Sequence, residues 1–246
     1  MRGDCERIRF TLRCPVAVLG DGVSGRSAAR LARSLGAEVE IYDEEGLSFG
    51  LHDAERAKVV VASPGFCRNH PWLDIAKRAG CSVVGELDFA SAAWGGEIIG
   101  VTGSNGKTTT TELVASLLGQ AQRRTVAAGN IGTPLCAMAG QSLELDAATL
   151  EVSSFQLETI AEFRPTIGVL LNLAPDHLDR HGSMENYIRA KARLFENQKP
   201  FDYAIVQLEA LRELGKLNLT PPSKIITFSA TDTSADFHLD RRLLVS

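Results

Sequence analysis

Short β-branched runs alternate with helical patterns along most of this chain of 246 residues. The run Val16-Ala17-Val18-Leu19 reads as a buried strand, and residues 24–35 place apolar side chains three and four apart, as in a helix. The same order returns with a strand at residues 98–101 and a long helix at 106–122. Because strands that alternate with helices form mainly parallel sheets, we expect an α/β protein.

The remaining segments extend this alternation and suggest two domains. Further strands are expected at residues 38–42, 58–62, 81–84, 125–128, 147–152, 166–171, 203–206 and 224–228. Further helices are expected at residues 71–79, 86–94 and 183–197, the last of them capped by Ser183. The chain from about Ser229 is expected to be irregular. Since the pattern restarts after Trp94-Gly95-Gly96, we expect one domain over residues 1–94 and a second over residues 95–246.

A first glycine-rich turn, Gly20-Asp21-Gly22-Val23-Ser24-Gly25, joins the first expected strand to its helix. Its glycines let the backbone approach a pyrophosphate, and the helix N-terminus offers free N–H groups to the charge. Asp43 follows at the end of the second strand, where an acid often meets a ribose or a base. NAD, FAD and a UDP-sugar all carry a pyrophosphate, and a tight turn without a ligand is the structural alternative. We expect a nucleotide phosphate here.

A second glycine-rich turn spans residues 100–109, Gly-Val-Thr-Gly-Ser-Asn-Gly-Lys-Thr-Thr. Val101 stands where the general phosphate-loop pattern has its first glycine, and Gly103 supplies a flexible residue inside the loop. Lys107 adds a cation for the β- and γ-phosphates, and the Thr108 hydroxyl can bind the accompanying magnesium. We therefore expect a nucleoside triphosphate site made of Gly103, Ser104, Asn105, Gly106, Lys107, Thr108 and Thr109.

Polar residues also follow the later strands, where active sites of α/β proteins collect. Glu151 ends the strand at 147–152 and can hold magnesium, the alternative being a capping or solvated acid. Asp and His residues are dense after the strand at 166–171, among them His177, whereas His181 reads as a surface residue. From its place in a helix alone, Lys191 reads as a solvated lysine.

The composition excludes several classes of protein. A formal charge of −4 disfavours a nucleic-acid binder held by bulk electrostatics. No apolar stretch approaches the roughly 20 residues needed to span a bilayer, and the N-terminus lacks the apolar core of a signal peptide. The five cysteines are scattered and never spaced as Cys-x-x-Cys, which disfavours a disulfide framework or a zinc ribbon. We expect a soluble cytoplasmic protein with reduced thiols that binds neither nucleic acid nor a membrane.

Together these motifs resemble the Mur ligases, the ATP-dependent amide-forming enzymes of peptidoglycan precursor synthesis. The resemblance rests on residues 100–109, on Gly129-Asn130-Ile131-Gly132, on Asp176-His177-Leu178-Asp179-Arg180 and on Ala190-Lys191. Residues 150–158, Leu-Glu-Val-Ser-Ser-Phe-Gln-Leu-Glu, are similar to the branch of the family that adds D-glutamate to UDP-N-acetylmuramoyl-L-alanine. Folylpolyglutamate synthases share the loop and the lysine but fit this segment less well.

The resemblance implies a Rossmann-like UDP-binding domain at residues 1–94 and a P-loop-type ATP-binding domain from residue 95. It also implies a third, amino-acid-binding domain, for which the sequence shows no matching segment. We therefore expect the central domain to be incomplete, and the chain to be a monomeric fragment that binds nucleotides without completing ligation alone. By the resemblance, Gly22, Val23, Ser24 and Gly25 lie near the pyrophosphate, Asp43 near the uridine and Asn130 near the reacting end of the substrate.

The resemblance also implies the catalytic residues, Lys107, Glu151, His177 and Lys191. Thr108 and Glu151 would bind one Mg²⁺ and His177 a second, which a carbamylated Lys191 would help to place. The reaction implied is phosphoryl transfer from ATP to the substrate carboxylate, followed by attack of the D-glutamate amine on the acyl phosphate. Two other classes stay open, namely an NAD-dependent oxidoreductase with an unrelated loop and a non-catalytic nucleotide-binding module.

Overall fold

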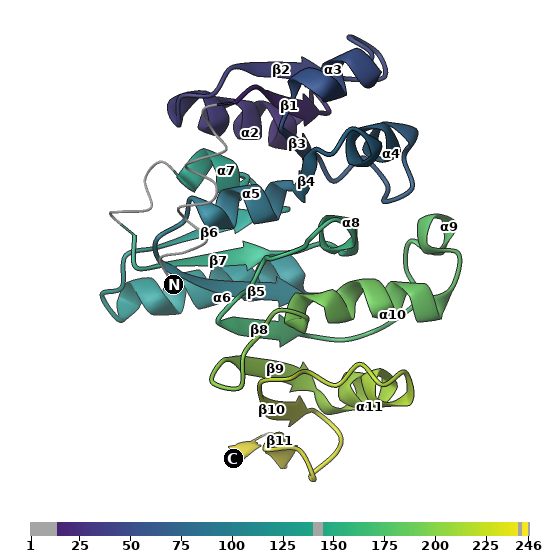
Figure 1. The fold of residues 1–246 in the computed structure, drawn as a ribbon. Coiled ribbons are helices and arrows are strands. Elements are labelled where there is room, and N and C mark those ends of the chain that lie inside the picture. The colour runs from purple at the N-terminus through teal and green to yellow at the C-terminus, as the bar shows by residue number, and fades with distance from the viewer. Residues whose placement is uncertain (1–13, 140–144, 241–242, 246) are drawn as a thin grey trace. The chain divides into compact units, whose positions relative to one another are not determined.

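The computed structural model describes residues 14–139, 145–240 and 243–245, which form two compact α/β units (Figure 1). The first unit holds the described residues up to Gly96, those from Gly132 onward that precede Asp146, and Glu158–Phe163. The second unit holds Glu97–Ile131, Asp146–Leu157 and the described residues from Arg164 onward. The α/β class expected from the alternating pattern is confirmed. The domain limits near residue 94 stay a prediction.

The first unit is built on a four-stranded parallel sheet in the order β2-β1-β3-β4. Its strands are β1 (Val16–Leu19), β2 (Val39–Tyr42), β3 (Val59–Ala62) and β4 (Ser82–Gly85). The two central strands, β1 and β3, are buried at every residue, as expected for parallel strands covered on both faces.

The helices of the first unit are α2 (Val23–Ser34), α3 (Leu51–Arg56), α4 (Pro71–Arg78), α5 (Glu86–Ala92) and α7 (Leu135–Met138). Pro71 begins α4, as the sequence indicates, and the His70 side chain caps it by accepting from the Trp72 N–H. The helix α3 was not predicted, because its 6 residues are too few to show an apolar period.

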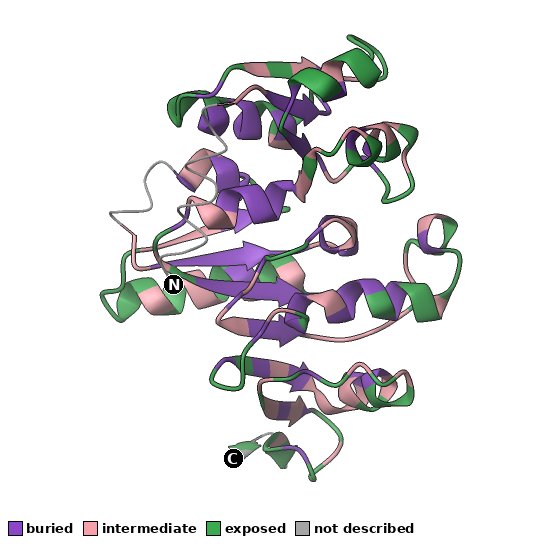
Figure 2. Ribbon diagram, in the orientation of Figure 1, coloured by how far each residue is buried: buried purple, intermediate pink, exposed green. Residues whose placement is uncertain are grey.

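The second unit is built on an eight-stranded sheet in the order β12-β11-β10-β9-β8-β5-β7-β6. Its strands are β5 (Glu97–Thr102), β6 (Thr125–Gly129), β7 (Ala147–Glu151), β8 (Ile167–Leu170), β9 (Tyr203–Gln207), β10 (Lys224–Ser229), β11 (Phe237–Asp240) and β12 (Leu243–Val245). All neighbouring strands are parallel except β11 and β12. The central strands β5 and β7 are buried over nearly their whole length (Figure 2).

The helices of this unit are α6 (Lys107–Gln120), α8 (Ser154–Glu158), α9 (Leu178–His181), α10 (Met184–Ala192), its 3₁₀ continuation η2 (Arg193–Phe195) and α11 (Leu208–Lys216). Val114 and Leu118 of α6 pack on one face of the sheet, against Ile99 and Val101. Each such side chain, when fully buried, contributes roughly 1.5–3 kcal/mol. Ser183 caps α10 as expected, accepting from the Asn186 N–H.

The expectation that the chain is irregular from Ser229 is wrong. Residues Phe237–Asp240 form β11, which lies parallel to β10 and antiparallel to β12. Its apolar alternation covers only 4 residues and follows a polar stretch, so the local signal is weak and the pairing with β10 decides the structure. No helix within the described ranges has the length and apolarity to cross a membrane.

Two acidic side chains of α5 organise the first unit. Asp88 accepts from the N–H groups of Ala161, Glu162 and Phe163 at 2.9, 2.7 and 2.6 Å. Glu86 is 2% exposed and accepts from the Cys136 N–H at 3.2 Å, while its Oε2 atom is buried and meets no partner among the described residues. This burial raises the pKa of Glu86 above its ordinary value of 4.5.

Glu86→Gln will change how stability depends on pH. Because the folded-state pKa is raised, the folded protein holds a proton that the unfolded chain releases above about pH 4.5. The contribution of Glu86 to folding is therefore largest at low pH and falls as the pH rises through the folded-state pKa. Glutamine does not titrate, so the variant lacks this pH-dependent contribution. As the pH rises from about 4.5 to the folded-state pKa, the free energy of unfolding of the variant should therefore increase relative to that of the wild type, by roughly 1.4 kcal/mol per unit of pKa elevation.

Urea unfolding of both proteins at several pH values measures this gain. Glu55→Gln, an exposed substitution on α3, is the matched control and should run parallel to the wild type. A difference between Glu86→Gln and the wild type that stays constant with pH would contradict the expectation.

Candidate active site

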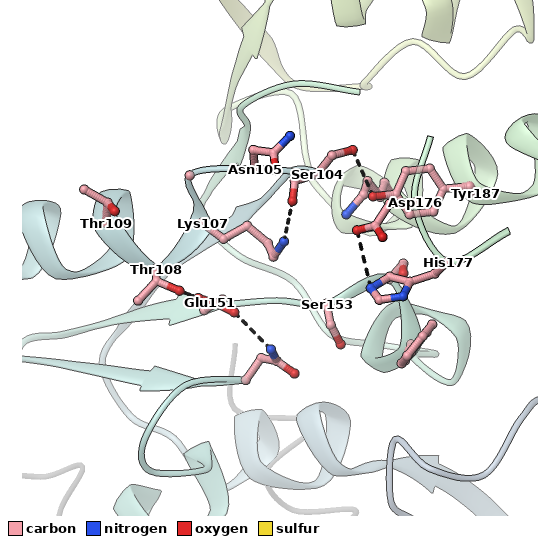
Figure 3. A pocket seen from close by; sticks show the side chains of 15 residues that line it. Ser104, Asn105, Lys107, Thr108, Thr109, Glu151, Ser153, Asp176, His177 and Tyr187 are labelled. Carbon is pink, nitrogen blue, oxygen red and sulfur yellow. Dashed lines mark hydrogen bonds and ion pairs between the residues drawn. The ribbon is translucent and has the colours of Figure 1, made fainter. Parts of the chain in front are cut away.

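A pocket of about 510 Å³ opens at the carboxyl ends of the central strands of the second unit (Figure 3). The strands β5, β6, β7 and β8 run parallel, so the residues that follow them meet at one edge of the sheet. Residues 104–109 line the pocket together with Asn130, Glu151, His177 and Lys191. Of the residues expected in the site of the second domain, the structure thus brings together all but Gly103 at the pocket wall.

The loop after β5 turns directly into α6. Gly106 is the N-cap of this helix, with a φ of +82°, and Lys107 is its first residue. The first N–H groups of a helix have no acceptor inside it and carry the positive end of the helix dipole, so they form an anion site. The Lys107 ammonium lies over this loop, donating to the carbonyl oxygens of Gly103 at 3.0 Å and Ser104 at 2.9 Å.

Glu151 ends β7 inside the pocket and is 3% exposed. The Thr108 hydroxyl donates to its Oε2 at 2.6 Å, and the Asn130 amide donates to its Oε1 at 2.9 Å (Figure 3). A carboxylate and a hydroxyl are hard oxygen ligands of the kind that magnesium prefers. Over the described residues there is no group of three or more His, Cys, Asp and Glu side chains placed to hold a metal. A magnesium ion here would therefore use Thr108 and Glu151 with oxygens of a bound substrate.

Lys191 is 1% exposed, so its interpretation as a solvated lysine is wrong. Its Nζ donates to the Gly103 carbonyl at 2.8 Å and lies 3.3 Å from the Thr102 hydroxyl and 4.8 Å from the centre of the Tyr187 ring. Burial and, to a lesser extent, the nearby Lys107 charge lower the pKa of Lys191 to about 7, against the opposing charges of Asp176 and Glu151. A large fraction of this side chain is therefore the neutral amine near pH 7.

The two histidines after β8 differ in exposure. His177 has a φ of +49°, in the left-handed region that non-glycine residues rarely adopt, and its Nε2 lies 3.4 Å from Asp176 Oδ2. Its side chain is 51% exposed and packs against the Phe155 ring. His181 is buried, contrary to its interpretation as a surface residue; its Nε2 lies 3.0 Å from the Ser154 hydroxyl, and its ring packs edge-on against the Tyr187 ring.

The first unit carries the residues expected to bind the UDP part of a substrate, at the start of α2 and just after β2. Gly22 is the N-cap of α2, Val23 and Ser24 begin the helix, and Gly25 packs under the turn. A Cβ atom added to Gly25 would stand 1.8 Å from the Gly20 carbonyl oxygen, so only glycine fits there. Asp43 accepts from the Asp21 N–H of the turn at 2.7 Å, and this bond and one from the Glu45 N–H lower the pKa of Asp43.

Several pocket residues were not singled out from the sequence. Ser153, Ser154, Phe155, Asp176 and Tyr187 all line the pocket. Tyr187 is 1% exposed, and its hydroxyl lies 2.9 Å from the Ser104 hydroxyl in the loop. A usable signal was present for Tyr187, because it stands four residues before Lys191 and so shares its helix face. The other four lie in segments already recognised as motifs.

Comparison with protein families gives one family description that matches more than half of the chain. The family description "Mur ligase middle domain" matches residues 101–245, which include the whole pocket. A second description, the C-terminal domain of alanine dehydrogenase/PNT, matches residues 7–63. A curated relative from Koribacter versatilis, named UDP-N-acetylmuramoylalanine--D-glutamate ligase, is 40% identical over 214 residues. The alignment covers 79% of this chain and 47% of the length of the relative. The chain spans about half the length of the curated relatives it matches.

Solved structures give the same fold. One from Neisseria meningitides, a UDP-N-acetylmuramate:L-alanyl-gamma-D-glutamyl-meso-diaminopimelate ligase, has a TM-score of 0.59 at 16% identity and covers 92% of this chain and 80% of its own. A MurF ligase from Thermotoga maritima in complex with ADP has a TM-score of 0.51 at 21% identity, covering 74% of this chain and 49% of its own. At such identities the likeness concerns the fold alone, whereas the match over residues 101–245 shows that the chain belongs to the Mur ligase family.

Proposed function

We propose that the chain serves an ATP-dependent ligase that joins D-glutamate to UDP-N-acetylmuramoyl-L-alanine in peptidoglycan precursor synthesis. The name of the 40% identical relative supports this substrate pair. The observation that carries the proposal is the meeting of residues 104–109, Glu151 and the buried Lys191 in one pocket. We further propose that the protein acts in the cytoplasm as a monomer.

ATP is the proposed ligand of the loop. The free N–H groups at the start of α6 suit a phosphate chain, and Lys107 lies within the same loop. A structural neighbour of the same fold is a complex with ADP, which supports an adenine nucleotide as a ligand. Residues Gly103 to Thr109 would then surround the phosphates, and Lys107 would offset their charge.

Magnesium is the proposed partner of ATP. Thr108 and Glu151 supply oxygen atoms for one ion, and His177 supplies a nitrogen for a second. A carbamate on Lys191 would add a carboxylate toward this second ion, and the neutral amine that carbamylation needs is favoured by burial. When bound, the ions withdraw charge from the transferring phosphoryl group.

The first unit is the proposed holder of the UDP part of the second substrate. The N-terminus of α2, at Gly22 to Gly25, faces no competing side-chain cap and suits the pyrophosphate. Asp43 borders this turn and is proposed to lie near the uridine. Asn130, at the end of β6, is proposed to lie near the reacting end of the substrate, beside Glu151.

The proposed reaction has two steps. The alanyl carboxylate attacks the γ-phosphorus of ATP, the bond to the β–γ bridging oxygen breaks, and ADP leaves, giving an acyl phosphate. The D-glutamate amine then attacks the acyl carbon, loses a proton, and inorganic phosphate leaves with the formation of an amide. Both partners of the first step are anions, so the Lys107 charge lowers the repulsion between them, and fixed donors at the start of α6 orient the phosphates.

A second candidate function has one observation in its favour. The match of residues 7–63 to the alanine dehydrogenase/PNT C-terminal domain favours a nicotinamide dinucleotide at the first glycine-rich turn. Lys107, Thr108 and Glu151 have no use in that chemistry, which is why the ligase is preferred.

Calorimetric titration of the chain with UDP-N-acetylmuramoyl-L-alanine and, separately, with NADH distinguishes these functions. We expect saturable binding of the UDP-sugar and no heat from NADH, because a substrate handle needs no nicotinamide site. Asp43→Asn should weaken binding of the UDP-sugar by about tenfold, the loss of one charge-assisted hydrogen bond. Binding of NADH without binding of the UDP-sugar would overturn the proposed function.

Glu151→Gln tests the proposed magnesium site. In the wild type, Mg²⁺ should strengthen the binding of ATP, and we expect the variant to lose about tenfold or more of this enhancement because a neutral amide is a poorer ligand. The measurement is the ATP affinity with and without Mg²⁺. Glu112→Gln, an exposed substitution on α6, is the control, and an equal Mg²⁺ effect in Glu151→Gln and the wild type would exclude this role.

Lys191 is expected to titrate near pH 7 and to react with CO₂ above that pH. Its ε-carbon resonance should follow a pKa of about 7, and Lys107→Met should raise that pKa because it removes a like charge. Addition of ¹³C-bicarbonate should give a carbamate signal that disappears in Lys191→Met and persists in the exposed control Lys77→Met. A carbamate signal that survives in Lys191→Met would refute the assignment.

A further inference from the structure

The side chain of Asn172, just after β8, pairs with the main chain of the phosphate loop. The Asn105 N–H donates to Asn172 Oδ1 at 2.9 Å, and Asn172 Nδ2 donates to the Asn105 carbonyl oxygen at 3.0 Å. A primary amide offers one acceptor and one donor side by side, as a peptide group does. An aspartate at this position would lack the N–H donor, and a serine side chain would be too short to reach both the N–H and the carbonyl of Asn105. The function proposed above does not use this contact.

This contact continues the pairing of β5 with β8. Thr102 pairs with Leu170, and the Leu171 N–H donates to the Thr102 carbonyl at 3.0 Å. One step on, the Ser104 N–H donates to the Asn172 carbonyl at 3.1 Å. Beyond Ser104 the main chain of the loop leaves the direction of the strand. The Asn172 side chain then forms the two hydrogen bonds to the Asn105 peptide that a neighbouring strand would otherwise form.

The turn at Gly103 is what lets the loop lie so close to β8. Gly103 has a φ of +156°, and an added Cβ atom would stand 3.0 Å from Leu171 Cβ and 3.4 Å from the Asn172 nitrogen. The connection after β8 holds the next residue as well. The Ser104 hydroxyl donates to the Ala174 carbonyl at 2.8 Å and accepts from the Ala174 N–H at 2.9 Å.

These contacts determine which N–H groups of the loop remain for a ligand. The N–H groups of Ser104 and Asn105 are taken by Asn172, and the carbonyl groups of Gly103 and Ser104 accept from lysines. Within the part of the chain that the structure describes, no hydrogen bond engages the N–H groups of residues 106–109. Four consecutive N–H donors at the start of α6 therefore remain for an anion.

We propose that Asn172 is a positioning residue that fixes the Asn105 peptide and thereby presents the N–H groups of residues 106–109 to the triphosphate. We call the two hydrogen bonds between the Asn172 side chain and the Asn105 peptide the clamp. The identity of the anion rests on the function proposed above, whereas the clamp does not. Because the clamp is made by groups of the chain itself, the loop needs little ordering when the phosphates bind, which favours affinity.

Hydrogen exchange of the wild-type chain tests the clamp without any variant. The Asn105 amide should be protected in the absence of nucleotide, although the residue is exposed. The amides of Gly106, Lys107, Thr108 and Thr109 should be unprotected until ATP and Mg²⁺ are added. An Asn105 amide that exchanges as fast as an open loop amide overturns the proposal.

Variants then test the effect of the clamp on binding. In Asn172→Ala, the Asn105 amide should lose its protection and ATP·Mg²⁺ should bind about tenfold more weakly, as for the loss of one net hydrogen bond. Asn172→Asp keeps the acceptor, so the Asn105 amide should stay protected in it. Asn69→Ala, the same change at an exposed position outside the pocket, should leave both readouts and the melting temperature as in the wild type.

The outcomes separate the two proposals. Wild-type ATP affinity in a folded Asn172→Ala variant that has lost Asn105 protection shows that the clamp does not position the phosphate donors, and overturns the inference. Absence of ATP binding by the wild type rejects the proposed function, while the exchange of the Asn105 amide still decides whether the clamp exists. If Asn172→Ala does not fold, the test is made on Asn172→Asp, which keeps the acceptor oxygen. An unprotected Asn105 amide in a folded Asn172→Asp variant overturns the inference.

Discussion

The parallel pairing of β5 with β7 on one side and β8 on the other determines where the site lies. In this register Val101 stands beside Glu151, and Thr102 stands beside Leu170. The strands therefore end level with one another, and the loop after β5 emerges between Glu151 and the segment that carries Asn172. Parallel strands put all such connections at one edge, so three distant stretches of sequence need no further device to meet.

The sequence predicts those parts of the site whose signal is local. The loop at 103–109 and its helix can be predicted because glycines, a lysine and a helical pattern stand next to one another. Burial of Lys191 cannot be predicted in this way, since helical spacing gives its face but not what covers that face. The cover comes from Thr102 and Gly103, almost ninety residues away, and only the sheet brings them to α10.

The fold has the same limit. Most strands of the second unit were predicted within a residue or two, because each contains a short apolar or β-branched run. The capture of residues 161–163 by Asp88 was not, since it links segments more than seventy positions apart. Nor was the strand β11, whose pairing with β10 outweighs its weak local pattern. What escapes prediction in each case is a contact made by a polar or exposed residue, for which apolar periodicity carries no information.

The two lysines of the pocket differ in burial, and this difference gives them different chemistry. Both donate to the Gly103 carbonyl, and burial together with the Lys107 charge lowers the pKa of Lys191. Lys107 is only partly buried, and it can exchange its two carbonyl acceptors for an anion, which makes stronger charge-assisted hydrogen bonds. Lys191 is only 1% exposed, so little water stabilises its charge, and the carbamate proposed above depends on this burial. The two hydrogen bonds between Asn172 and the Asn105 peptide hold the loop that both lysines contact.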